Sequence, residues 1–392
     1  MTSAPAGARS PRLRVQLVVA SLARIVTNTA HRMVYPFLPV FARGLGVPLE
    51  TLTGLISLRG ALGMSAPLFG SLPDHIGRRR AMLLGLGLFV AALLLPVLLP
   101  GLWTFAAALL LVVVVKFIFD TALQAYVGDR TPYHQRGLAI AFTELAWSSA
   151  ALIGFPLVGL AVARGGWQGP FLPLAGLGLL GWAAVWFTLP RDADAPPTRP
   201  PGSLGVRWLD LWRRPSVVAA LGLAVLIAAA NESLLVVLGA WLEQSFGLSV
   251  AALGLSTTII GVAELAGEGL VMGLADRLGK RRAVGLGLVA SAAAYLAMPF
   301  LAARLALALV ALFLVFIAFE FTIVASLPLM TEQMPEARSR VMSTYAAGHA
   351  AGRMLGALLG AALFRQGFVW NGVAALGLNL VGLLVVVLFV RE

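Results

Sequence analysis

The sequence contains no cysteine, and charged residues fill only 12% of its 392 positions. Without cysteine there can be no disulfide, no thiolate metal site and no cysteine nucleophile. With so few charges and 59% hydrophobic residues, a soluble globule would lack the polar surface that it needs. Period-two alternation is also missing, because the apolar runs are continuous and rich in Leu, Ala and Gly, which excludes a membrane β-barrel. The chain is therefore expected to lie in lipid as helices.

The apolar runs recur along the whole chain, and each is long enough to cross a hydrocarbon core of roughly 30 Å as a helix. Hydropathy and helix breakers predict an all-α membrane protein with twelve transmembrane helices. Their expected ranges are 15–41, 49–71, 80–99, 102–128, 136–163, 170–190, 216–243, 249–274, 283–302, 304–329, 340–364 and 368–390.

One long polar connection, 191–214, separates six predicted helices from six others. It contains four prolines, where a compact domain would not place so many. The expected organisation is an N-terminal six-helix bundle at 1–190, a cytoplasmic linker at 191–214 and a C-terminal six-helix bundle at 215–392.

An internal repeat supports this division. The segment Asp74–Arg80 recurs as Asp276–Arg282, 202 positions later. Two further pairs are each 203 positions apart: Asn28 with Asn231, and Pro132 with Pro335. Duplicated halves are typical of membrane transporters, so the two six-helix bundles are predicted to be pseudo-symmetric.

The net charge of +12 is explained by topology. Of the 29 basic residues, about two thirds fall on the side that holds both termini and the linker, and five lie inside predicted helices: Arg24, Arg32, Arg59, Lys116 and Arg353. By the positive-inside rule, both termini are expected to be cytoplasmic in a multi-pass protein of the cytoplasmic (inner) membrane. No soluble stretch is long enough for a nucleic-acid-binding domain.

The loop between the second and third helices, Gly70–Arg80, resembles the signature G-x-L-a-D-r-x-G-r-r of the major facilitator superfamily. Its second copy has Met272 in place of the leading glycine. The resemblance covers nearly the whole chain and implies a major facilitator fold of the drug/metabolite exporter-like kind, in which such loops gate the cytoplasmic side. The alternative is that the arginines only anchor topology. The implied gating residues are Gly70, Asp74, Gly77, Arg78, Asp276, Gly279 and Lys280.

The fifth predicted helix contains Gly154–Gly159, which is similar to the antiporter signature of this family, although Phe155 and Leu160 replace glycines. The Gly and Pro residues there permit a bend. This partial match favours export over import. The fourth helix departs from the exporter pattern, since it has Lys116, Asp120 and Gln124 where exporters often have an arginine and a Gln-Gly pair; the coupling mechanism stays open.

Ionisable residues at membrane depth cost about 2.5–3.5 kcal/mol each on insertion scales, so they are expected to face the bundle interior. The family cavity is lined mainly by helices one, four, seven and ten. The resemblance, with two residues of helix five that could bind a cationic or aromatic substrate, implies a cavity set of Asn28, Arg32, Lys116, Asp120, Gln124, Glu144, Trp147, Asn231, Glu232 and Glu320. Bases dominate the first half and acids the second, which suggests a cationic wall for an anionic group. Opposite charges could neutralise each other across the halves, as in a pairing of Arg32 with Glu232. The alternative is that the charges form structural ion pairs or lie near helix ends, as for Arg24 and Glu268.

Proton coupling is assigned to acids of the second half. Glu264 and Glu268 lie one turn apart and should not both ionise easily in a low dielectric. The predicted proton-coupling set is Glu232, Glu264, Glu268 and His349, although a lone helical histidine can simply be a packing residue.

No phosphate loop, GxSxG elbow or metal cluster is present in the sequence, so neither an enzyme nor a cofactor or metal site is expected, and ATP is not the energy source. The predicted function is secondary active transport of a small molecule by alternating access, with proton-coupled efflux as the preferred form. Two alternatives stay open: an uptake permease or uniporter for a small metabolite, and a non-transporting membrane sensor with the same fold. The expected partners are the substrate, protons and membrane lipid, with no nucleic acid, and the chain is expected to be a monomer.

Overall fold

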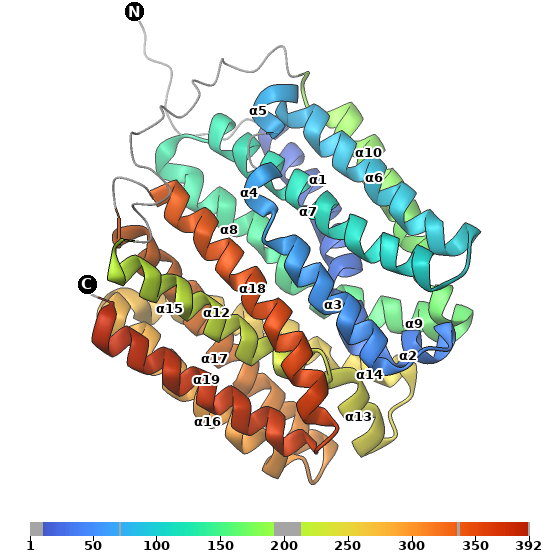
Figure 1. The fold of residues 1–392 in the computed structure, drawn as a ribbon. Coiled ribbons are helices and arrows are strands. Elements are labelled where there is room, and N and C mark those ends of the chain that lie inside the picture. Colours follow the sequence, from blue (N-terminus) through green and yellow to red (C-terminus); the bar gives the residue numbers. More distant parts are fainter. Residues whose placement is uncertain (1–10, 70–71, 192–212, 335–337, 391–392) are drawn as a thin grey trace, which may run out of the picture. The chain divides into compact units, whose positions relative to one another are not determined.

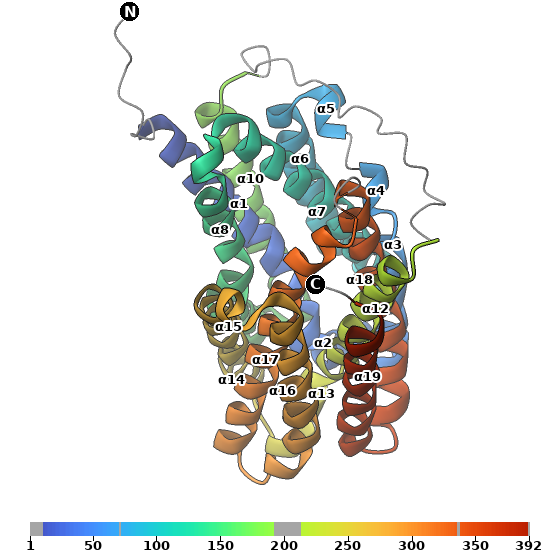
Figure 2. The same cartoon turned by 90° about the vertical axis from the view of Figure 1, so that its left-hand side faces the viewer.

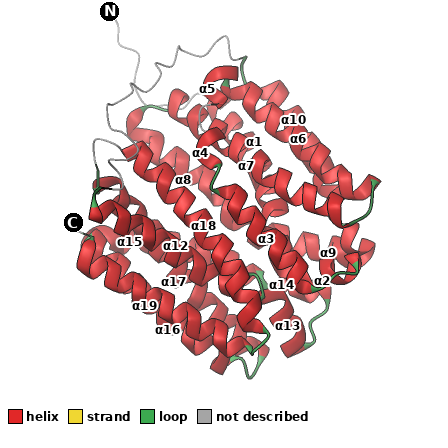
Figure 3. Cartoon of the chain, viewed as in Figure 1, coloured by secondary structure: helices red, strands yellow, loops and turns green. Residues whose placement is uncertain are grey.

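The structure is a computed structural model that describes residues 11–69, 72–191, 213–334 and 338–390, and within these ranges it is almost entirely helical, with no strand (Figure 3). Most of the expected linker and Gly70 lie outside the described residues. In chain order the α-helices are α1 (Pro11–Arg32), α2 (Val34–Leu45), α3 (Leu49–Gly63), α4 (Ala66–Phe69), α5 (Leu72–Ile76), α6 (Arg78–Leu98), α7 (Leu102–Arg130), α8 (Tyr133–Ser149), α9 (Phe155–Gly165), α10 (Phe171–Thr188), α12 (Pro215–Leu235), α13 (Leu238–Phe246), α14 (Val250–Ser256), α15 (Thr258–Leu278), α16 (Lys280–Leu301), α17 (Leu305–Glu332), α18 (Arg338–Phe364) and α19 (Phe368–Phe389).

In the part of the chain that the structure describes, nine helical stretches are long and apolar enough to cross a membrane. They correspond to the third to tenth and the twelfth predicted spans. The other three predicted spans are helical as well, in α1–α2, α3–α4 and α18. Each of these three carries a charge at membrane depth: Arg32, Arg59 and Arg353, respectively.

Several predicted spans are interrupted. The first is broken at Met33, because Pro36 has no N–H to donate to the carbonyl group of Arg32. The fifth contains a π-helical turn, η1 (Ala150–Gly154), directly before α9, where the Gly-Pro segment predicts a bend. The eighth is broken at Thr257, whose hydroxyl group donates to backbone carbonyls of the preceding turn.

The described helices group into two compact units. Unit 1 comprises Met1–His31, Phe69–Ala150 and Phe171–Pro200, and unit 2 comprises Arg32–Leu68, Ala151–Pro170 and Pro201–Glu392. Unit 2 therefore contains α2, α3 and α9 from the first half of the chain together with α12 to α19. The boundaries of the units fall at or beside the break at Met33, the end of α4, the π-helical turn and the start of α10. The division of the chain at the linker stays a prediction.

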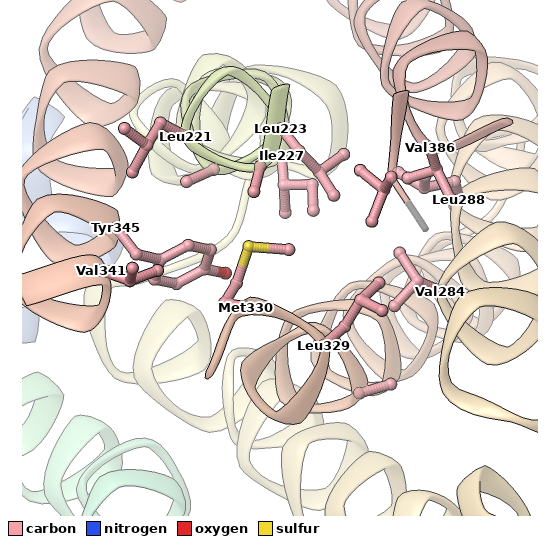
Figure 4. Packing of buried hydrophobic residues seen from close by; sticks show 14 of the residues in the cluster. Leu221, Leu223, Ile227, Val284, Leu288, Leu329, Met330, Val341, Tyr345 and Val386 are labelled. Atoms are coloured by element: carbon pink, nitrogen blue, oxygen red, sulfur yellow. The ribbon is translucent and has the colours of Figure 1, made fainter. Parts of the chain in front are cut away.

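Each unit has its own apolar core. In unit 1 the core includes Met82, Phe119 and Leu123, from α6 and α7. In unit 2 the core lies among α12, α16, α17, α18 and α19. Figure 4 shows that Ile227, Met330 and Tyr345 of this core point toward one another.

Close helix packing is most evident between α12 and α18, which lie side by side in both views (Figures 1 and 2). The glycines of α18 recur at a spacing of four, which predicts tight helix packing, and the structure confirms this prediction at Gly348, Gly352, Gly356 and Gly360. A Cβ atom added at Gly352 would lie 2.3 Å from the carbonyl oxygen of Val225. Small residues allow such approach where lipid supplies no hydrophobic driving force for association.

Candidate functional site: buried charge clusters and two repeat loops

The first repeat loop joins α5 to α6 through Gly77. Gly77 has a φ of 95°, a conformation that side-chain-bearing residues rarely adopt. Arg78, the next residue, forms an ion pair with Asp74 and donates from Nε to Asp129 Oδ2 at 3.0 Å. A single guanidinium group thus connects the loop to the end of α7.

The second repeat loop joins α15 to α16 with the same geometry. Gly279 has a φ of 81°, and Lys280 forms an ion pair with Glu332 at the end of α17. The side chain of Asp276 lies outside the described residues.

The arginine that follows in each loop also occupies an equivalent place. Arg79 donates to the backbone carbonyl of Trp186 at 2.7 Å, and Arg281 donates to that of Val387 at 2.6 Å. The glycine turn, the ion pair to the next helix end and the arginine–carbonyl contact therefore all recur in the second half, about 202 positions after their first copies.

Four charges meet inside unit 1, and we call Arg24, Lys116, Asp120 and Glu144 the unit 1 cluster. Arg24 Nε lies 3.1 Å from Asp120 Oδ1, and Arg24 Nη1 lies 2.9 Å from Glu144 Oε1. Lys116 Nζ lies 2.5 Å from Asp120 Oδ2. The two bases and two acids neutralise one another, as buried charges must.

Two of the other predicted cavity residues join this cluster. Lys116 donates to Asn28 Oδ1 at 2.6 Å and lies 5.2 Å from the centre of the Trp147 ring. The His31 and Trp147 ring centres are 6.3 Å apart. Gln124, by contrast, is exposed on α7.

Arg32 and Glu264 form a buried bidentate ion pair inside unit 2. Arg32 Nη1 lies 3.0 Å from Glu264 Oε2, and Nη2 lies 2.6 Å from Oε1, with both side chains at most 5% exposed. The predicted pairing of Arg32 with Glu232 is wrong. Arg32 ends α1 directly before the break at Met33, and there its side chain reaches α15 rather than α12.

A second group of unit 2, Tyr35, Arg59, Glu232 and Arg353, is called the unit 2 cluster. The Tyr35 hydroxyl group donates to Glu232 Oε1 at 2.6 Å, and Arg353 Nε lies 3.8 Å from Glu232 Oε2. The Arg59 guanidinium lies over the Tyr35 ring, 5.5 Å from its centre. Glu232 is fully buried. Residues from α2, α3, α12 and α18 are thus held around one carboxylate.

The remaining predicted site residues of unit 2 are also placed on helices. Asn231 accepts a hydrogen bond from the Tyr295 hydroxyl group at 3.0 Å. Glu320 is buried on α17, and its Cβ atom would lie 2.8 Å from a Cβ added at Gly267 of α15. Glu268 and His349 are half-buried.

The broad cationic wall that the base-rich first half suggests is mostly neutralised. Arg24 and Lys116 pair with acids of the unit 1 cluster, and Arg32 pairs with Glu264. Arg59 differs, because no carboxylate of the described residues lies within ion-pair distance of it.

Sequence reasoning assigned no role to Tyr35 or Arg59. Tyr35 carries no formal charge, so an inventory of ionisable groups passes over it. Arg59 lies in the middle of a predicted span, and that position was the available signal for a functional residue.

The buried clusters join several helices through ion pairs and hydrogen bonds. In the described ranges, no group of three or more His, Asp or Glu side chains could hold a metal ion.

The chain is similar to several bacterial membrane proteins. It is 24% identical to the MFS-type transporter YbcL of Bacillus subtilis (strain 168) over 46% of this chain and 47% of that protein. It is 27% identical to the inner membrane transport protein YdhP of Escherichia coli (strain K12) over 61% of each chain. It is 25% identical to the multidrug resistance protein MdtG of Yersinia enterocolitica over 72% of this chain and 69% of that protein. The chain thus spans about half to three fifths of the length of the first two relatives.

Among solved structures, the fold matches a bacterial homologue of the human lysosomal transporter Spinster in an inward-facing and unoccupied conformation. The TM-score is 0.75 at 13% identity, and 98% of this chain and 96% of the other are covered. The sequence pattern of the Major Facilitator Superfamily matches twice, at residues 20–230 and 221–392. The two matches together cover nearly the whole chain, so the chain belongs to the Major Facilitator Superfamily, and its long apolar helices make it a multi-pass membrane protein.

Proposed function

We propose that this transporter exports a small molecule across the inner membrane in exchange for protons, by alternating access, with both termini in the cytoplasm. The name of MdtG, a multidrug resistance protein, supports export. The partial antiporter signature beside the π-helical turn at Ala150–Gly154 supports it too. The proposed partners are the substrate, protons and lipid, and the proposed working form is a monomer.

The Arg32–Glu264 ion pair carries the proposal of proton coupling. It links the end of a first-half helix to a second-half helix, α15, and both side chains are buried. Separating two buried, paired charges is costly unless one of them is neutralised. A proton on Glu264 would do this, since a neutral carboxyl group no longer needs the guanidinium. Proton uptake at Glu264 and release of Arg32 would then occur together.

Other acids are placed to take part in this cycle. Glu268 follows Glu264 by one turn of α15, and Glu232 holds its own cluster. Glu264 ranks first because its partner comes from the other half of the chain and is held through two hydrogen bonds. The cavity residues named from the sequence remain part of this proposal, with Gln124 the weakest member because it is exposed.

The two repeat loops are proposed as gates. In each loop a base next to a glycine turn pairs with an acid at the end of a neighbouring helix: Arg78 with Asp129, and Lys280 with Glu332. The Lys280–Glu332 side chains are 33% and 42% exposed, so water can replace this pair at small cost, whereas the Arg78 side chain is 11% exposed and its pairing with Asp129 is more costly to break.

The test is flux in proteoliposomes with an imposed pH gradient, using a panel of cationic dyes and aromatic carboxylates. The variants are wild type, Glu264→Gln and, as a matched control, Glu50→Gln, which makes the same change at an exposed residue. Gradient-driven flux that is lost only in Glu264→Gln is expected. Flux that ignores the gradient would indicate a uniporter or uptake permease. Flux absent for every compound would favour a non-transporting sensor.

A further inference from the structure

Glu232 is the carboxylate around which the unit 2 cluster is arranged. Two guanidinium groups, those of Arg59 and Arg353, are close enough to Glu232 for their charges to interact with this carboxylate. They also repel each other. Glu232 already accepts a hydrogen bond from Tyr35 through Oε1. Of these two guanidinium groups, that of Arg353 forms the ion pair with Glu232, whereas that of Arg59 lies beyond ion-pair distance of any described carboxylate.

Arg59 is buried in this cluster with neither an ion-pair partner nor a complete set of hydrogen bonds among the described residues. Its side chain is 5% exposed, and its buried Nη2 has no hydrogen-bond partner among the described residues. The Tyr35 ring offsets part of its charge, but a ring face accepts no strong hydrogen bond. A buried guanidinium with an unused donor is costly, so a bound group that accepts this hydrogen bond would stabilise it.

Two further buried atoms, on helices α12 and α18 of this cluster, also lack hydrogen-bond partners in the described part of the chain. They are Glu232 Oε2, which faces Arg353 at 3.8 Å, and Nδ1 of His349. His349 precedes Arg353 by one turn on α18, near enough for their charges to repel. An unpartnered donor of Arg59 and an unpartnered acceptor of Glu232 therefore belong to the same cluster.

We propose that the unit 2 cluster binds a monovalent anion at Arg59, in the form of a carboxylate group of the transported molecule. A carboxylate matches the planar fork of a guanidinium with two parallel hydrogen bonds, and its charge would pair with that of Arg59, which has no described carboxylate within ion-pair distance. Oxygen Oε2 of Glu232 remains available for a donor such as a hydroxyl group next to that carboxylate. The word "transported" rests on the proposed function, whereas the anion site itself does not.

The test measures equilibrium binding, so that it can succeed or fail independently of flux. Sodium lactate, which has a carboxylate beside a hydroxyl group, is titrated by calorimetry into the purified full chain in chloride-free buffer, and sodium chloride is titrated separately. Arg59→Gln removes the proposed charge, and Arg59→Lys keeps the charge without the planar fork. Arg365→Gln is the matched control, since it makes the same change at an exposed arginine. Size-exclusion chromatography shows whether each variant is folded.

Lactate is expected to bind the wild type and Arg365→Gln alike, and to bind Arg59→Gln at least tenfold more weakly, because a charged hydrogen-bonding partner is lost. Arg59→Lys should fall between them. If chloride binds in the same Arg59-dependent way and lactate does not, the anion site stands but its occupant is an inorganic ion rather than a substrate carboxylate. Absence of binding by both anions to the wild type, or equal binding to Arg59→Gln, would overturn the proposal.

Discussion

Arg43 and Glu243 are joined by two hydrogen bonds of 2.8 Å each, which connect α2 to α13 inside unit 2. The two helices come from different halves of the chain. The Arg43 side chain is 58% exposed, so the pair lies where water can reach it.

Removing this pair should change the access of water to the buried face of α13 more than it changes the stability of the protein. An exposed ion pair contributes about 0–1 kcal/mol, so Arg43→Gln should barely alter the unfolding midpoint. Ala240, one turn before Glu243, is 3% exposed. Because the chain has no cysteine, Ala240→Cys supplies a single thiol, and its labelling by a water-soluble maleimide should accelerate severalfold when Arg43→Gln is added. Arg365→Gln is the control. Equal labelling rates for Ala240→Cys alone, with Arg43→Gln and with Arg365→Gln would show that the pair does not restrict the access of water to α13.

Asp120 should be the acid on which the unit 1 cluster depends. It contacts both bases, Arg24 and Lys116. Asp120→Asn leaves two buried cations with Glu144 alone, so a loss of about 3–5 kcal/mol in unfolding free energy is expected, as for a broken buried pair. The measurement is unfolding of the purified chain in detergent.

Two comparison variants give this prediction its specificity. Glu144→Gln should cost less, since that side chain is 39% exposed and contacts Arg24 alone in the cluster. The double change of Lys116→Gln with Asp120→Asn should recover part of the loss, because charge balance is restored. A double variant less stable than Asp120→Asn would argue against the electrostatic explanation.

The fold could be read from the sequence because each span imposes a long local signal that needs no partner. Apolar runs of membrane length predicted the helices, and the repeated Asp-x-x-Gly segment predicted the duplicated loops, whose glycines have the same left-handed φ. Helix breaks were harder to predict. Pro36 is a clear sequence signal for the first break. The break at Thr257 has no such signal, because it accompanies a hydrogen bond from the Thr257 hydroxyl group to a backbone carbonyl of the preceding turn.

Pairing of the buried charges could not be read in the same way. Which acid meets Arg32 depends on the direction its side chain takes at the break beside Met33, and that direction is set by how α2 packs against helices more than 200 residues away. As a result, Glu232 accepts a hydrogen bond from Tyr35, a residue without formal charge, and Glu264 forms the ion pair with Arg32. The residue types at the site were predictable, but their partners depend on tertiary packing.

Gly352 should tolerate no side chain. A Cβ atom there would lie 2.3 Å from a backbone oxygen of α12, and backbone cannot move aside as a flexible side chain can. Gly352→Ala is expected to lower the unfolding free energy by about 1–3 kcal/mol, the usual cost of overpacking. Gly269→Ala on α15 is the matched control, since nothing lies within 4 Å of its added Cβ. A similar effect of both substitutions would indicate that general helix propensity, not the α12–α18 contact, is being measured.

Gly77 and Gly279 should respond alike to substitution by alanine, because both have a φ in the left-handed region, at 95° and 81°. An L side chain held in that sparsely populated region costs about 1–3 kcal/mol, so Gly77→Ala and Gly279→Ala should each lower the unfolding free energy by that amount. Gly128→Ala is the control, since Gly128 lies in α7 with open space around its added Cβ.

Strain in the first loop should also shift Arg78 away from Asp129, which can be checked by adding Asp129→Asn. If the loop geometry positions Arg78, Asp129→Asn should cost less in the Gly77→Ala background than in the wild type, whereas purely additive losses would separate the turn from the ion pair.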